Sequence, residues 1–203
     1  MANELSGARI CFALTGSFCT LERAIGQMKQ LRLSGAEILP VFSDNVRTMD
    51  SRFGTAAYWR GQVMEAADCD EIIDTIQKAE PIGPGKLCDI LLIAPCTGNT
   101  ASKLANGITD TPVLMAAKSH LRNGLPLAIA IATNDGLAAN AKSIGALLGR
   151  RNIFFVPFGQ DDPRHKPNSL VADMEKIPDT LIFALDNRQI QPILSCKYTS
   201  MVV

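Results

Sequence analysis

Short apolar runs alternate with segments of helical spacing along most of the chain. Five runs stand out: Arg9–Leu14, Glu37–Phe42, Asp89–Ala94, Leu125–Ala132 and Asn152–Pro157. Each is short enough for a strand, and they are continuously apolar rather than alternating, which is typical of parallel strands covered on both faces. The pattern therefore predicts an α/β fold, a Rossmann-like, doubly wound parallel sheet in a single domain.

Helical spacing fills the gaps between these runs. The predicted helices cover Leu21–Leu33, a segment around Tyr58 and Trp59, a segment that carries Leu104, Ala105 and Ile108, Pro112–Asn123, and a segment from Ala138 to Leu148. Glu71–Thr75 fits either a short strand or a helix, and Pro81–Gly85 has the composition of a turn. Because proline lacks an N–H, Pro40 predicts that the second strand is irregular or lies at a sheet edge.

The C-terminal part of the chain breaks the alternation of strands and helices. The polar stretch Phe158–Pro167 predicts a loop or lid, and Ser169–Leu185 predicts one more helix, interrupted near Pro178. We therefore expect an α/β domain over residues 8–158, a loop and helix packed on that domain over 159–194, and a disordered tail over 195–203.

Charge and composition narrow the classes of function. The 203 residues carry 20 basic and 20 acidic side chains, and the sequence pI is about 6.7. A net charge of zero argues against a nucleic-acid binder that relies on neutralising phosphates. The sequence has no apolar stretch long enough for a membrane span or a secretory leader, so we expect a cytoplasmic protein.

Six cysteines are the unusual feature of the composition. They form no CxxC pair and the two histidines stand far apart, so no metal site is expected. Cys11 and Cys88 lie in or beside strands and are interpreted as packing residues. Cys19 and Cys96 lie beside candidate ligand turns, yet no histidine near them in sequence offers a base. For His120, in a predicted helix, and His165, in the polar loop, the expectation is a surface or capping role. Tyr58 and Trp59 are interpreted as packing residues.

Small polar residues follow three of the predicted strands, in the turns Thr15–Ser17, Thr97–Thr100 and Thr133–Gly136. In an open α/β sheet, ligands bind at the carboxyl ends of the strands. The helix that follows each turn offers unpaired N–H groups that suit a phosphate. The alternative is that each hydroxyl merely caps its helix. Neither GxxxxGK[ST] nor GxGxxG is present, so the Walker and dinucleotide fingerprints are absent.

Around the second of these turns the sequence carries a specific motif. Ile93–Thr100, continued by Ser102–Ile108 and Asp110, resembles the PASANT signature of the flavin-dependent cysteine decarboxylase family of flavoproteins, and the likeness spans about residues 8–158. The resemblance implies FMN as a cofactor and a homo-oligomer. The cofactor-binding residues that it implies, together with the turns, are Gly16, Ser17, Ser43, Thr97, Gly98, Asn99, Thr100, Thr133 and Asn134.

Further segments narrow the resemblance to one branch of that family. They include Arg52–Gly54, Lys78–Pro81, Pro112–Lys118, Phe154–Pro163 and Lys166–Ser169. The likeness implies one subunit of a synthase that makes a small aromatic dicarboxylate in sporulating bacteria, placed in the cytoplasm of the mother cell. It also implies a separate partner subunit that resembles a dehydrogenase and brings NADP or NAD. Arg52 and Lys103 are candidate counter-charges for carboxylates, or else solvated surface charges.

The sequence departs from the decarboxylase pattern at the catalytic position. Pro81 stands where the family carries a catalytic histidine, and the family's Pro-Ala-Met-Asn segment has only Ala132–Asp135 as its nearest candidate. Because proline accepts no proton, decarboxylation by the family mechanism is not expected, and catalytic residues stay unassigned. Three functions are therefore carried forward: the synthase subunit, an FMN-dependent decarboxylase of a cysteine-like carboxylate, and a non-catalytic module that binds flavin or a partner.

Overall fold

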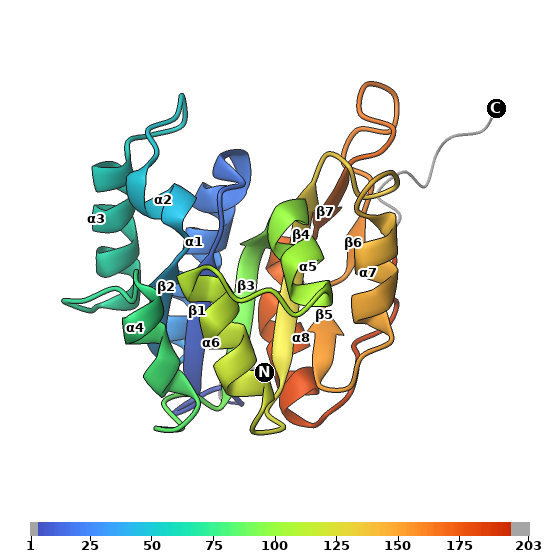
Figure 1. The fold of residues 1–203 in the computed structure, drawn as a ribbon. Coiled ribbons are helices and arrows are strands. Elements are labelled where there is room, and N and C mark those ends of the chain that lie inside the picture. Colours follow the sequence, from blue (N-terminus) through green and yellow to red (C-terminus); the bar gives the residue numbers. More distant parts are fainter. Residues whose placement is uncertain (1–3, 196–203) are drawn as a thin grey trace.

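A mostly parallel sheet runs through the centre of the molecule, with helices on both of its faces (Figure 1). The structure, a computed structural model, describes residues 4–195. The strand order is β2-β1-β3-β4-β7-β6, and β5 pairs with β4 as well. The strands are β1 (Arg9–Leu14), β2 (Glu37–Phe42), β3 (Ile90–Cys96), β4 (Leu127–Thr133), β5 (Ile153–Phe155), β6 (Phe158–Gly159) and β7 (Leu170–Ala172). The predicted α/β fold is confirmed.

The helices divide between the two faces, as a doubly wound sheet requires. In Figure 1, α5, α6 and α7 lie in front of the sheet, while α1 and α8 lie behind it. The helices are α1 (Phe18–Leu33), α2 (Asp44–Thr48), α3 (Ala56–Ala67), α4 (Ile76–Ala79), α5 (Gly98–Ala105), α6 (Pro112–Leu121), α7 (Ala141–Leu148) and α8 (Ile177–Leu185). Two short 3-10 helices, η1 (Glu80–Ile82) and η2 (Met174–Lys176), complete the set.

The central strands are buried on both sides, which explains their continuous apolar sequence. All residues of β3 are buried, and so are all but the last of β4 and all but the first of β1. The edge position predicted from Pro40 is confirmed, because β2 ends the sheet and pairs only with β1 along its length. The segment Glu71–Thr75 contributes a single isolated bridge, between Ile73 and Val41, at that edge.

The C-terminal segment corrects the predicted all-parallel sheet. The residues predicted to begin a helix at Ser169 instead form β7, which runs antiparallel to both β4 and β6. Leu170 and Val171 pair with Thr133 and Ala132, which lie beyond the end of the pairing between β4 and β5. The helix starts only at Ile177. A three-residue strand carries too little pattern to be separated from a helix by periodicity, so its partner on β4 decides the outcome.

One strand end differs from its prediction. The strand predicted to stop before Pro95 continues through it to Cys96, with a register shift against β4. The predicted tail, 195–203, lies outside the described residues except for Ser195, whose N–H donates to the Phe158 carbonyl oxygen at 2.9 Å. Among the described helices, none has the length and apolar character needed to cross a membrane.

Candidate functional site

The three polar turns meet in one cleft at the carboxyl edge of the sheet. Strands β1, β3 and β4 are adjacent and parallel, so the residues that follow them lie side by side. The cleft has a volume of about 670 Å³. Its walls come from the turns and the start of α1, with residues of the C-terminal segment closing one side; they include Gly16, Ser17, Phe18, Cys19, Arg23, Phe53, Thr97, Gly98, Thr133, Asn134, Asp135, Asp161, Lys166 and Val171.

A second, smaller pocket adjoins the cleft on the side of β2. Its volume is about 360 Å³, and it shares Gly16 and Thr97 with the cleft. Its other lining residues include Ser43, Asn45, Asn99, Thr100, Lys103 and Asp110. Each of the nine residues named as cofactor-binding in the sequence thus lines the cleft, this pocket or both. Their placement brings the predicted set together, while its role stays a prediction.

Thr15 fixes two of the turns relative to each other. Its side chain is buried, its Oγ1–H donates to the Pro95 carbonyl oxygen at 2.7 Å, and the N–H of Thr97 donates to the same Oγ1 at 2.9 Å. The turn after β1 is thereby tied to the turn after β3 through one hydroxyl. A threonine hydroxyl both donates and accepts, so it can satisfy both backbone groups at once.

Capping accounts for some of the turn hydroxyls but not for all of them. Thr97 caps α5, because its Oγ1 accepts from the N–H of Thr100 at 3.3 Å, and the Ser43 Oγ accepts from the N–H of Val46 at the start of α2. Ser17 differs, since it precedes α1 yet makes no capping hydrogen bond with its side chain. Its hydroxyl has only a long contact of 3.9 Å with the Cys19 Sγ, and the residue lines the cleft. A ligand can therefore engage this hydroxyl without uncapping a helix.

The charges at the cleft are not those expected from the sequence. Arg52 stacks over the Phe53 ring, with its guanidinium carbon 4.8 Å from the ring centroid, and does not line the cleft. Lys103 donates to Asp110 at 2.6 Å in the adjoining pocket, and this contact lowers the pKa of the Asp110 carboxyl. Instead, Arg23 of α1 and Lys166 of the loop between β6 and β7 line the cleft. Nothing in the local sequence singled them out.

Both of these cations already contact acidic groups at the protein surface. Arg23 lies 2.8 Å from Glu175, and the Nζ of Lys166 lies 3.5 Å from Asp161. All four side chains are exposed to solvent by about a third or more. Ion pairs of this kind contribute little to stability, so a carboxylate in the cleft would compete readily for either cation.

The cysteines beside the turns have opposite environments. Cys19 is exposed and lines the cleft. Cys96 is buried, and burial raises the pKa of its thiol to about 12, so it is a thiol at neutral pH and no nucleophile. Among residues 4–195, no group of three histidine, cysteine or acidic side chains is arranged to hold a metal ion.

Neither histidine lines the cleft or the adjoining pocket. His165 is exposed beside Asp162, as expected. His120 corrects the prediction of a surface role: it is fully buried and its ring contacts Cys88 and the Pro126 carbonyl oxygen. Cys88, interpreted from the sequence as a packing residue, is buried and also contacts a histidine that lies 32 residues away in sequence. Pro81 lies in η1, and it lines neither cavity.

Comparison with known proteins places the chain in a family. The family model described as flavoprotein matches residues 1–176. The chain belongs to the flavoprotein family. It is 48% identical, over 97% of its length and 98% of the relative's, to the B subunit of dipicolinate synthase from Bacillus subtilis. These values also place it in the branch of dipicolinate synthase B subunits, which is the branch that its sequence motifs resemble.

Solved structures of flavoproteins have the same fold. The crystal structure of the dipicolinate synthase B subunit from Bacillus halodurans matches with a TM-score of 0.87 and 45% identity, over 95% of this chain and 98% of that one. SpaF, an FMN-dependent cysteine decarboxylase, matches with a TM-score of 0.65 and 18% identity, over 90% of this chain and 99% of that one. At 18% identity the second match shows a shared fold alone.

Proposed function

We propose that this chain is the B subunit of a dipicolinate synthase of sporulating cells. In this proposal it works in the mother-cell cytoplasm with a dehydrogenase-like A subunit that brings NADP or NAD. Together they oxidise a dihydrodipicolinate-type intermediate to the aromatic pyridine dicarboxylate. The observation that carries the proposal is the near full-length similarity to a protein that is itself a dipicolinate synthase B subunit. That relative is named as one subunit of a synthase, which supports a partner, and we propose a homo-oligomer by family resemblance.

The residues at the start of α1 fit the phosphate of FMN. A helix of 16 residues presents unpaired N–H groups and a partial positive charge at its first turn, and Ser17 adds a hydroxyl that is not used for capping. Gly16 and Thr97 border both cavities, so a flavin held there would span them. We propose that the nine turn residues hold FMN, which when bound supplies a two-electron acceptor.

Two cations in the same cleft suit a dicarboxylate. Arg23 offers a planar fork of donors that matches a carboxylate, and Lys166 offers a point charge from the loop between β6 and β7. We propose that these two side chains bind and orient the two carboxylates of the substrate.

The cleft argues against the decarboxylase alternative. A proton acceptor placed like the family histidine would need an imidazole at the site, and within residues 4–195 neither histidine lines the cleft or the adjoining pocket. A substitution at Asn99 distinguishes the synthase subunit from the non-catalytic alternative. Asn99 is an exposed residue of the adjoining pocket, so replacing it does not disturb the core. Asn99→Ala leaves synthase activity intact if the subunit only supports its partner, and lowers it if the pocket takes part in the reaction.

Reconstitution of the two subunits tests the proposed function. Purified chain, purified A subunit and freshly made dihydrodipicolinate are mixed with NADP or NAD, and pyridine dicarboxylate is followed by its ultraviolet absorbance. We expect product only when both subunits are present. Full activity of the A subunit alone overturns the proposal. Flavin absorbance bands in the freshly purified chain, or a shift of the FMN bands when FMN is added to it, test the cofactor separately. A colourless chain that gives no shift overturns the cofactor proposal.

A further inference from the structure

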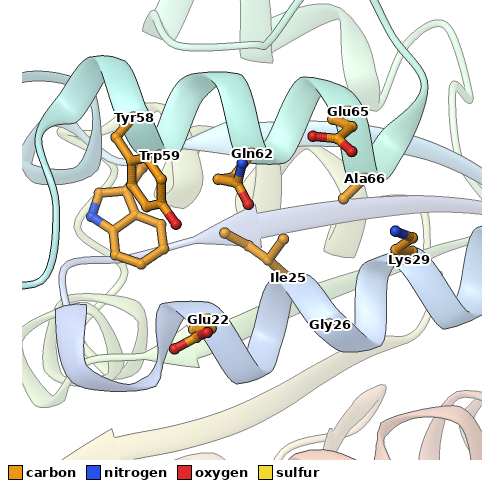
Figure 2. Close-up of a pocket in the computed structure, with 9 residues that line it drawn as sticks. All are labelled: Glu22, Ile25, Gly26, Lys29, Tyr58, Trp59, Gln62, Glu65 and Ala66. Atoms are coloured by element: carbon orange, nitrogen blue, oxygen red, sulfur yellow. The ribbon is translucent and has the colours of Figure 1, made fainter.

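A groove between α1 and α3 lies outside the cleft (Figure 2). Its volume is about 190 Å³, which is below the usual size of a cofactor site and near that of one large side chain. Ile25, Trp59 and Ala66 form its buried walls. The remaining lining residues are Glu22, Gly26, Lys29, Tyr58, Gln62 and Glu65.

Gly26 keeps one side of the groove open. It lies inside α1, is exposed, and a Cβ atom built on it would meet nothing within 4 Å. Packing within the chain therefore does not require a glycine here, although glycine inside a helix costs about 1 kcal/mol relative to alanine. The missing side chain leaves the α1 backbone accessible from the groove.

Aromatic rings close one end of the groove. The rings of Tyr58 and Trp59 meet edge to face with centroids 5.0 Å apart, and Figure 2 shows both at the same end. A Cβ atom on Gly54 would lie 3.1 Å from the Trp59 Nε1, so the indole nitrogen is directed toward that loop. The groove consequently meets the carbon part of the buried indole, while the half-exposed Tyr58 ring offers the surface over which a guanidinium stacks.

Three charged side chains surround the groove without an ion pair of their own. Glu22 and Lys29 come from α1 and Glu65 from α3. Most charged side chains nearby are paired: Arg23 with Glu175, Arg32 with Asp68 and Arg60 with Asp74. Within the described part of the chain, Glu22, Glu65 and Lys29 enter no ion pair. The groove thus carries a net negative charge, with Glu22 on the side of the aromatic rings and Glu65 at the other end, beside Lys29 (Figure 2).

An exposed apolar segment connects the groove with the cleft. Met49, Phe53 and Tyr58 are each exposed by more than two fifths. Phe53 lines the cleft and Tyr58 lines the groove. A protein seated in the groove would therefore extend over this apolar segment to the mouth of the cleft, where the proposed substrate binds.

We propose that the α1–α3 groove is the docking site for an arginine side chain of the dehydrogenase-like partner subunit. The guanidinium lies against the exposed Tyr58 ring, beside the edge of Trp59, and pairs with Glu22, and Met49 and Phe53 cover the surrounding contact. Arginine fits because it stacks on aromatic rings and binds carboxylates through a fork of donors, which the groove offers together. This inference rests on the proposed function, since it identifies the surface used by the proposed partner.

Substitution of Gly26 tests the groove with a matched control. Gly26→Leu places a side chain in the groove, whereas Gly61→Leu places one on α3 at another exposed glycine with nothing within 4 Å and outside the groove. Both replace glycine by a better helix former, so neither threatens folding. Calorimetry with the purified A subunit should show Gly26→Leu binding at least tenfold more weakly than wild type, with Gly61→Leu unchanged.

Charge neutralisation tests the kind of occupant. Glu22→Gln should weaken the affinity for the A subunit about tenfold and make that affinity less dependent on salt concentration, while Lys29→Gln at the other end of the groove should not weaken it. The reverse pattern shows an anionic occupant and overturns the inference. The inference is also overturned if Gly26→Leu dissociates a homo-oligomer and leaves the affinity for the A subunit intact. Absence of binding by the wild-type chain overturns the proposed partnership and the inference with it, whereas wild-type binding that Gly26→Leu does not weaken overturns the inference alone.

Discussion

The Nδ1 atom of His120 lies 3.5 Å from the Sγ atom of Cys88, with both side chains buried at the end of the sheet opposite the cleft. The Nε2 atom of the same ring lies 2.9 Å from the Pro126 carbonyl oxygen. A carbonyl oxygen only accepts, so Nε2 carries a hydrogen. Hydrogen bonding from Cys11, and then from His120, lowers the pKa of Cys88 to about 6 against the burial that raises it.

This buried pair predicts a pH dependence of stability. The pKa of Cys88 is lower in the folded chain than its ordinary value of 9.0, so folding favours the thiolate. Its contribution to the free energy of unfolding is full above pH 9 and is lost as the pH falls toward 6. In denaturant unfolding, the free energy of unfolding of wild type should rise relative to that of Cys88→Ser between pH 6 and pH 9. The rise is at most about 1.4 kcal/mol per pH unit. Parallel curves for the two proteins contradict the prediction.

We predict that the Thr97 hydroxyl stabilises the fold, whereas the Ser17 hydroxyl binds the ligand. Thr97 caps α5 and Ser17 caps nothing with its side chain, although both line the cleft. Thr97→Ala should lower the free energy of unfolding by about 1 kcal/mol, the usual cost of losing an N-cap. Ser17→Ala should leave stability within about 0.5 kcal/mol of wild type and weaken FMN binding. Urea unfolding and a flavin fluorescence titration measure the two effects. Equal destabilisation by both changes contradicts the assignment.

Loss of the Thr15 hydroxyl should loosen the cleft. Thr15→Val keeps the shape of the side chain but leaves the Thr97 N–H without its acceptor, while the Pro95 carbonyl oxygen keeps only the backbone N–H of residue 15, at 3.3 Å. Because the Thr97 N–H lies in a partly buried junction, the expected loss of stability is about 1–3 kcal/mol. Thr133→Val is the matched control, since the Thr133 hydroxyl accepts from Asp135 and Asn140, both later in the same connection, and ties no second strand to the first. A smaller loss for Thr15→Val than for Thr133→Val contradicts the role given to Thr15.

The sequence predicts local structure better than it predicts long-range contacts. The bounds of β1 and β2 are those expected, because each is a short apolar run with clear ends. The three turns meet because parallel neighbouring strands end at one edge, which follows from the fold class. No such rule predicts the contact between His120 and Cys88, because the distance between them depends on how α6 packs beside β3.

The cations of the cleft were not predicted either, because their positions also depend on long-range packing. Arg23 lies on the exposed side of α1, where a charge is expected in any soluble helix. Lys166 reaches the cleft only because β6 and β7 fold back against the end of β4. The sequence instead suggested Arg52 and Lys103, which stand near the recognised motifs but are held by Phe53 and Asp110.

Arg23 provides the sharpest test of the substrate cleft, because α1 supplies its own control. Arg23 and Arg32 lie on the same helix and each pairs with one surface carboxylate, yet only Arg23 lines the cleft. Arg23→Gln and Lys166→Gln should each weaken binding of pyridine dicarboxylate to the chain about tenfold, as expected for loss of one charge-assisted contact. Arg32→Gln should not change it. Calorimetry at two salt concentrations should also show a smaller salt effect in the two cleft variants, since each removes one screened charge interaction. Unchanged affinity in Arg23→Gln, with the helix folded as in Arg32→Gln, rules this arginine out of carboxylate binding.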